Sequence, residues 1–217
     1  MAAAGADVRQ GRGGRRRRKD ARPAEILDAA FEAFARSGFS GTRLDDVAAR
    51  AGITKGTIYV YFSGKEELFV AAVKEVTRPI RENLAGLTAS LDEAASRPAG
   101  DILREHFGFV YGRMVADRRG RELVRMLLAE AERFPELAER WHAEVIGPCL
   151  DGLARIVRHG VRRGEFRACA GVDYPQLLLA PVIMASTWQS LFARSRPIDL
   201  ERYLDGHLDL LLAGLRR

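Results

Sequence analysis

Residues 42–68 read TRLDDVAARAGITKGTIYVYFSGKEEL and contain two short helical patterns on either side of a glycine. The first pattern ends at Arg50, and Thr54 begins a second helix that runs to about Phe62. Gly52 allows the positive φ that a tight reversal between two helices commonly needs. This spacing predicts a helix-turn-helix, a shape that binds DNA in some proteins and is a plain packing unit in others.

The outer face of the predicted second helix carries small and hydroxylated side chains. Such a face lets a helix lie deep in a major groove, where threonine and tyrosine hydroxyls bond phosphates and lysine reaches a phosphate or a base edge. Lys65, at the start of the next helix, adds a cation beside free backbone N–H groups. The candidate contacts on the second helix are Thr54, Lys55, Gly56, Thr57, Tyr59, Val60 and Tyr61.

The rest of the chain repeats apolar residues at helical spacing, with glycine and proline between the repeats and almost no β-branched alternation. We expect an all-α fold of about nine helices. Thr42, with Asp45 three residues later, is a variant of a capping box that would open the second of them. The predicted helices cover residues 23–38, 42–50, 54–62, 65 to the late eighties, 101–116, 119–132, 135–163, 173–194 and 199–215.

The positive charge of the chain is concentrated at its N-terminus. Residues 1–22 hold eight basic and two acidic side chains, a net charge of +6 that equals the net charge of all 217 residues. A glycine- and alanine-rich block of like charge is typical of disorder, either as an arm that follows phosphates or as a solubilising leader. Residues 23–70 hold five basic and seven acidic side chains, so we expect the arm to supply much of any attraction to DNA.

Residues 51–68 match the pattern Ala-Gly-Ile-x-x-Gly-x-Ile-Tyr-x-Tyr-Phe-x-x-Lys-Glu-x-Leu throughout, and the chain around them resembles the DNA-binding head of the TetR/AcrR family of transcriptional regulators. The resemblance implies a helix-turn-helix domain over residues 23–70 and a larger helical domain over residues 71–217 that holds a small-molecule pocket and a homodimer interface. It also implies that each subunit places its second motif helix in a major groove. The implied DNA contacts are Arg43, Thr54, Lys55, Gly56, Thr57, Tyr59, Val60, Tyr61 and Lys65.

Asp45 departs from the family pattern, because some members have a basic or neutral base-reading residue there. Its carboxylate would either cap the first motif helix or accept a bond from a cytosine amino group.

Aromatic and methionine side chains recur on the helices predicted for the larger domain. Together they predict an apolar cavity for a ligand, although a residue of this kind taken alone is more often part of the ordinary core. The last two helices, 173–194 and 199–215, are expected to form the dimer surface, and the alternative is that their apolar stripe packs onto its own domain. The candidate ligand contacts are Phe107, Tyr111, Met114, Met126, Trp141 and Trp188.

Several function classes lack their usual sequence pattern. There is no nucleophile triad or phosphate-binding loop, Cys149 and Cys169 lack zinc-site spacing, and no apolar run reaches the ~18–20 residues of a membrane span. We therefore expect a cytoplasmic protein that is not an enzyme and has no cofactor, metal or membrane partner. The predicted function is a ligand-responsive, sequence-specific DNA-binding regulator, a repressor released by a small apolar or amphipathic molecule.

Two alternatives remain at this point. The negative head favours a helical small-molecule-binding protein or enzyme without a specific DNA role, and the basic arm would also suit an activator or an architectural DNA binder.

Overall fold

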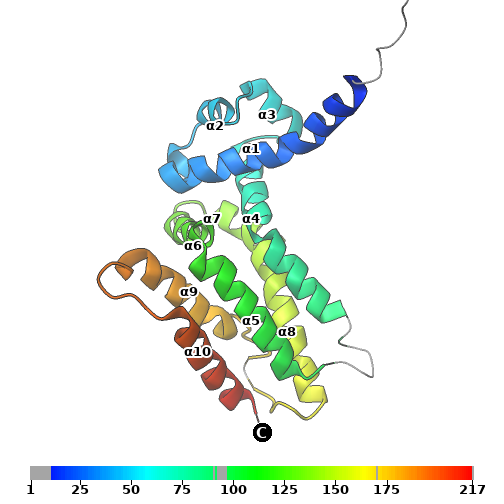
Figure 1. The fold of residues 1–217 in the computed structure, drawn as a ribbon, viewed down its shortest axis with the longest axis vertical. Coiled ribbons are helices and arrows are strands. Elements are labelled where there is room, and N and C mark those ends of the chain that lie inside the picture. The colour runs from blue at the N-terminus through cyan, green and yellow to red at the C-terminus, as the bar shows by residue number, and fades with distance from the viewer. Residues whose placement is uncertain (1–10, 90, 92–96, 170, 217) are drawn as a thin grey trace, which may run out of the picture. The chain divides into compact units, whose positions relative to one another are not determined.

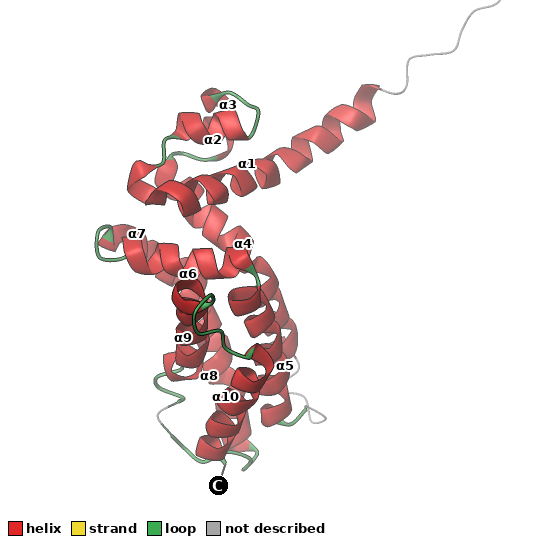
Figure 2. Ribbon diagram, turned by 60° about the vertical axis from the view of Figure 1, so that its left-hand side comes forward, coloured by secondary structure: helices red, strands yellow, loops and turns green. Residues whose placement is uncertain are grey.

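The computed structural model describes the whole chain except residues 1–10, 90, 92–96, 170 and 217, and the described residues form helices and loops without a strand (Figure 2). The short π-helical turn η1 continues α5, and η2 joins α7 to α8, so these residues form nine continuous helical segments, as the sequence predicts. The elements are α1 (Gly11–Gly41), α2 (Leu44–Arg50), α3 (Lys55–Tyr61), α4 (Lys65–Ala89), α5 (Ala99–Tyr111), η1 (Gly112–Ala116), α6 (Arg118–Glu130), α7 (Pro135–Trp141), η2 (His142–Ile146), α8 (Gly147–Arg162), α9 (Gln176–Phe192) and α10 (Leu200–Leu215).

The chain divides into two units within α4, the first ending at Glu75 and the second beginning at Val76. In the first unit, the aromatic rings of α1 and α4 pack together. Phe69 makes edge-to-face contacts with Phe34 and Phe39, at ring-centroid distances of 5.1 and 5.3 Å. These contacts hold α1 against α4 and leave α2 and α3 on one side of the unit.

Helix α1 differs from the sequence prediction at its start and agrees at its end. It begins at Gly11, twelve residues before the predicted start at Pro23, and so replaces the disorder expected over 11–22; residues 1–10 lie outside the described part. Arginine, lysine and alanine are good helix formers and favour this extension, although Pro23 inside the helix removes one hydrogen bond and crowds the turn before it. The helical conformation is interrupted at Gly38, close to the predicted end of the helix, where φ is 70° and ψ is 173°. The φ is positive, but this ψ is not that of a left-handed helical cap.

In the second unit, α5 lies between α8 and α10 (Figure 1). The interior is formed by aliphatic and aromatic side chains from these three helices together with α4 and α9. A Cβ on Gly152 of α8 would lie 2.6 Å from a methyl carbon of Leu84, so the missing side chain permits the observed approach of α4 to α8. In the same unit, α6 packs along α9.

Candidate nucleic-acid interface

A sharp turn joins α2 to α3 and orients both helices. The N–H of Ile53 donates to the carbonyl of Ala48 at 3.0 Å, and Gly52 between them has a φ of 65°. Val47 and Ile58 are completely buried beneath the turn. The predicted helix-turn-helix is therefore present, with an apolar side that packs on the first unit and a polar side that does not.

The polar side of α3 carries the side chains that the sequence singled out. Thr54, Lys55 and Gly56 are exposed, Thr57 and Tyr61 are half-buried, and Tyr59 and Val60 are 52% and 75% exposed. A Cβ on Gly56 would meet no atom closer than the Thr54 hydroxyl oxygen at 3.8 Å. Internal packing therefore does not require a glycine at this position, and its backbone is open to the close approach of another molecule.

The start of α2 differs from the prediction. Its N-cap is Arg43, which makes no side-chain capping bond, so the capping box expected from Thr42 and Asp45 is wrong. The Thr42 hydroxyl instead donates to the carbonyls of Gly38 and Ala33, at 2.7 and 3.1 Å. Carbonyls at the end of a helix lack helical N–H partners. The Thr42 hydroxyl therefore donates to carbonyls at the end of α1 and does not cap the start of α2.

Two of the predicted phosphate-binding cations have partners within the first unit. The Lys55 ammonium lies 3.0 Å from a carboxylate oxygen of Asp45, and this hydrogen bond raises the pKa of Lys55. The Lys65 ammonium donates to the carbonyls of Ser40 and Thr42, at 3.4 and 3.2 Å, and lies 4.5 Å from the centre of a phenylalanine ring. The structure therefore gives Lys65 a role in holding the loop before α2, beside the phosphate contact predicted for it.

The predicted ligand contacts in the second unit do not form a single cluster. Phe107 and Tyr111 are buried in the main core, with Met114 partly buried against it. Met126 and Trp141 are buried outside that core, on α6 and α7. Trp188 is half-buried, and its indole N–H donates to the carbonyl of Arg196 at 2.8 Å.

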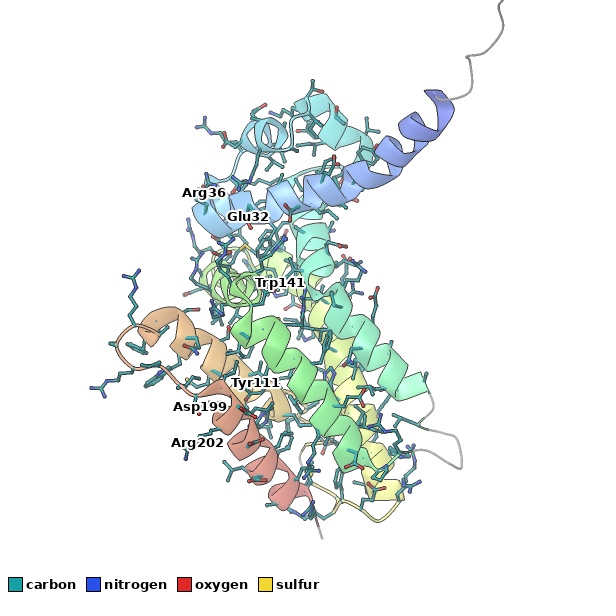
Figure 3. The ribbon with its side chains drawn as sticks, in the orientation of Figure 1. Glu32, Arg36, Tyr111, Trp141, Asp199 and Arg202 are labelled. Atoms are coloured by element: carbon teal, nitrogen blue, oxygen red, sulfur yellow. The ribbon has the colours of Figure 1, made fainter. Side chains whose placement is uncertain are left out.

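His207 joins two of these residues to α10, a contact that the sequence analysis missed. The Tyr111 hydroxyl lies 3.1 Å from Nδ1 of His207, and the Phe107 ring lies 4.8 Å from the imidazole ring, between centroids. Figure 3 labels Tyr111 on α5, beside α10. Burial lowers the pKa of His207, which favours the neutral imidazole.

An open groove of about 590 Å³ lies between α9 and α10. Apolar side chains dominate its walls, and His207 and Tyr203 separate it from Tyr111, whose ring centroid is 6.2 Å from that of Tyr203. None of the predicted ligand contacts lines it. Its lining residues are Leu177, Pro181, Arg202, Tyr203, Gly206, His207, Leu210 and Leu211.

Exposed apolar side chains continue along α9 beyond the groove. Leu177, Met184 and Leu191 are 59%, 56% and 66% exposed and follow one another at intervals of seven residues, which places them on one side of the helix. On α10, Leu210 is 80% exposed. Part of the apolar stripe predicted on α10 is buried in its own unit instead, through Leu208, Leu212 and Leu215.

The described residues contain neither a metal-binding cluster nor a membrane-spanning helix. No group of three or more His, Cys, Asp or Glu side chains there could hold a metal ion. Similarly, no helix in that part of the chain is both long and apolar enough to span a membrane.

The chain is similar to known proteins along most of its length. Residues 26–72 match the model of bacterial regulatory proteins of the tetR family, and residues 103–211 match that of the tetracyclin repressor-like C-terminal domain. The transcriptional regulator TtgR of Pseudomonas putida is 28% identical over 198 residues, which cover 87% of this chain and 90% of TtgR.

Two solved regulators share the fold. SmeT, the repressor of a Stenotrophomonas maltophilia multidrug efflux pump, is 25% identical with a TM-score of 0.70, covering 90% of each chain. A second SmeT structure is a complex with triclosan. The regulator FadR of Bacillus subtilis, solved with stearoyl-CoA, is 22% identical with a TM-score of 0.66, covering 89% of this chain and 99% of FadR.

Proposed function

The chain belongs to the tetR family of bacterial regulatory proteins and is a DNA-binding transcriptional regulator, and on that premise we propose that it is a repressor released from its operator by a small apolar or amphipathic molecule. The observation that carries the proposal is the exposed polar side of α3, held by the turn at Gly52. We assign residues 23–70 to DNA binding and residues 71–217 to the effector and the dimer. A cytoplasmic location follows from this role.

The DNA contacts are proposed on the second motif helix and at the starts of α2 and α4. Thr57, Tyr59 and Tyr61 would bond phosphates through their hydroxyls, and Gly56 would let the backbone of α3 approach the groove floor. Arg43 and Lys65 would bind phosphates at either side, and Val60 would make an apolar contact. Thr54 and Lys55 would lie at the N-terminal end of α3, where Lys55 can reach a phosphate or a base edge.

The dimer is proposed to form through α9 and α10. Apolar side chains at seven-residue intervals suit packing against a second helix, and exposed apolar surface of this extent is uncommon on monomers. A symmetric contact would pair α9 and α10 with the same helices of a second copy, making a four-helix bundle. The two copies of α3 would then reach successive major grooves ~34–36 Å apart.

The effector is proposed to bind within the second unit, near the buried aromatic side chains. TtgR is a regulator of the same family, SmeT binds triclosan and FadR binds stearoyl-CoA, and a shared apolar interior favours molecules of that general character here. An effector that prefers a second packing of this unit would move α4 and change the spacing of the α3 helices. A coupling free energy of ~1–3 kcal/mol would change DNA affinity roughly 5- to 150-fold.

The first test is selection of duplex DNA from a random library by the full-length protein, followed by fluorescence anisotropy against the enriched duplex and a scrambled one. Specific regulators prefer their site by ~10³ or more. A comparable affinity for both duplexes would contradict the proposed function. Release of the enriched duplex by members of a panel of apolar and amphipathic compounds would identify the effector class.

The dimer is tested by Met184→Glu, with Leu128→Glu as the matched control. Both side chains are exposed, at 56% and 60%, so neither charge should unfold the protein. We expect light scattering to give a monomer for the α9 variant and a dimer for the α6 variant, because the charge would be buried only in the first case. A dimer in both variants would place the interface elsewhere.

A further inference from the structure

Asp45 and Lys55 form an ion pair across the turn of the helix-turn-helix. Asp45 lies in the first turn of α2 and Lys55 is the first residue of α3, and their charged groups are 3.0 Å apart. The two side chains remain 65% and 46% exposed, respectively. A cation on the proposed DNA-facing surface is thus neutralised before any DNA is bound.

We propose that Asp45 is a positioning residue that occupies the place of a DNA phosphate on Lys55, so that it holds the ammonium in position and lowers the affinity for non-specific DNA. The inference rests on the proposed DNA-binding function and deepens it, since it names a residue that increases the preference for the operator over other sequences.

The geometry of the pair suits a contact that DNA can exchange. An exposed pair of this kind changes an equilibrium by no more than about fivefold, so a phosphate in a well-fitted complex can take the place of the carboxylate. Non-specific binding depends almost entirely on phosphate contacts, whereas binding to an operator also uses base contacts. The loss of one available cation therefore weakens non-specific binding by a larger proportion than it weakens operator binding. A lysine ammonium is charged at neutral pH even at its ordinary pKa of 10.5, and the bond with Asp45 raises that pKa further, so the exchange is between two ionic partners.

Other cations of residues 23–70 also have internal partners, so few of that segment's cations remain for contacts with phosphates. Arg50 lies 3.8 Å from the carboxylate of Glu32, and Lys65 donates to two carbonyls. With a net charge of −2 over residues 23–70, each cation that is engaged internally removes a sizeable part of the attraction that this segment itself offers to phosphates. Capping of α2 does not account for Asp45, because Arg43 is the N-cap and makes no side-chain capping bond.

Asp46 provides a matched control. It is also exposed, lies in the same turn of α2 and has the same charge, but the ion pair of Lys55 in the described structure is with Asp45. Asp45→Asn and Asp46→Asn therefore change the net charge equally, and only the first releases the ammonium. Lys55→Gln, alone and combined with each of the two, completes a double-mutant cycle.

The experiment measures binding of the full-length variants to the duplex enriched from a random library by the wild-type protein and to a scrambled duplex of equal length. Anisotropy titrations run from about 50 to about 200 mM KCl, where phosphate contacts are most visible. We expect Asp45→Asn to tighten binding to the scrambled duplex by up to about fivefold and to steepen its salt slope by up to about 0.9. Asp46→Asn should increase the affinity for the scrambled duplex by a smaller factor. In the Lys55→Gln background, Asp45→Asn and Asp46→Asn should have equal effects on that affinity.

Three outcomes would overturn the inference. Asp46→Asn could match the gain of Asp45→Asn, which would make the effect one of net charge. The gain could persist with Lys55→Gln, or Asp45→Asn could weaken only the enriched duplex, which would mean that Asp45 contacts a base directly. If the wild-type protein enriches no duplex, the proposed function fails, while the scrambled-duplex series still decides the role of Asp45.

Discussion

His106 is expected to make the second unit sensitive to acid. Its side chain is 2% exposed on α5, and Nδ1 lies 2.8 Å from the amide oxygen of Asn83 on α4. The imidazole N–H therefore donates to that oxygen and joins the two helices. Burial lowers the pKa of His106 from its ordinary 6.5 to about 4.

The sign and size of the effect follow from these two pKa values. Above pH 6.5 the imidazole is neutral in both states, and the free energy of unfolding has its full value. As the pH falls from 6.5 towards 4, the unfolded chain binds a proton that the native chain excludes, so stability decreases. At ~1.36 kcal/mol for each pKa unit, the loss is about 2 kcal/mol between pH 7 and pH 5 and about 3 kcal/mol by pH 4.

Urea unfolding of the wild-type protein and His106→Gln at pH 7 and pH 5 measures this loss. Glutamine keeps an N–H donor for Asn83 and does not titrate, so the wild type should lose about 2 kcal/mol more than the variant. His207 titrates in the same direction but is present in both proteins. An equal loss in the two proteins, or an NMR titration of the His106 ring protons with a midpoint near 6.5, would refute the reasoning.

Two further predictions concern the packing of the second unit. A Cβ on Gly120 would lie 2.0 Å from the backbone oxygen of Arg113, so Gly120→Ala should cost ~3 kcal/mol and lower Tm by ~6–12 °C. A Cβ on Gly108 would meet no atom within 4 Å, so Gly108→Ala should stabilise by ~0.5–1 kcal/mol, and equal melting temperatures of the two variants in a calorimeter would contradict this. Tyr111→Phe removes the partner of Nδ1 of buried His207 and should lower the free energy of unfolding in urea by ~1–3 kcal/mol, and an unchanged midpoint would show that the bond contributes nothing.

The helices could be predicted from the sequence because their signals are local. Helical periodicity, together with the glycines at positions 38 and 52, placed most boundaries within a few residues. The predictions differed from the structure where a local sequence signal fits two different structures. A basic, glycine-rich block can be a disordered arm or the first turns of α1, and the Thr42 hydroxyl can cap the helix after it or the helix before it.

The interactions of the candidate sites were harder to predict, because they join residues that are distant in sequence. Lys55 and Asp45 are ten residues apart on different helices, and Tyr111 and His207 are separated by 96 residues. Periodicity assigns each of these side chains to one face of its own helix. It does not show which other helix that face packs against. The sequence therefore identified the residues of the helix-turn-helix without their internal partners, and it missed the groove beside His207.

His207 lies between the buried aromatic side chains and the proposed dimer surface, so it is placed to transmit the effect of a bound effector. One side of the imidazole contacts Phe107 and Tyr111, which are buried, and the same residue lines the groove between α9 and α10. A molecule that displaced the Tyr111 hydroxyl would leave a buried nitrogen of α10 without its partner, at a cost of ~1–3 kcal/mol. That cost is as large as the coupling free energies of known allosteric proteins. A shift of α10 that restored the bond would relieve this cost, and we expect such a shift to carry the effect of a molecule bound in the aromatic interior to the surface where a second copy is proposed to bind.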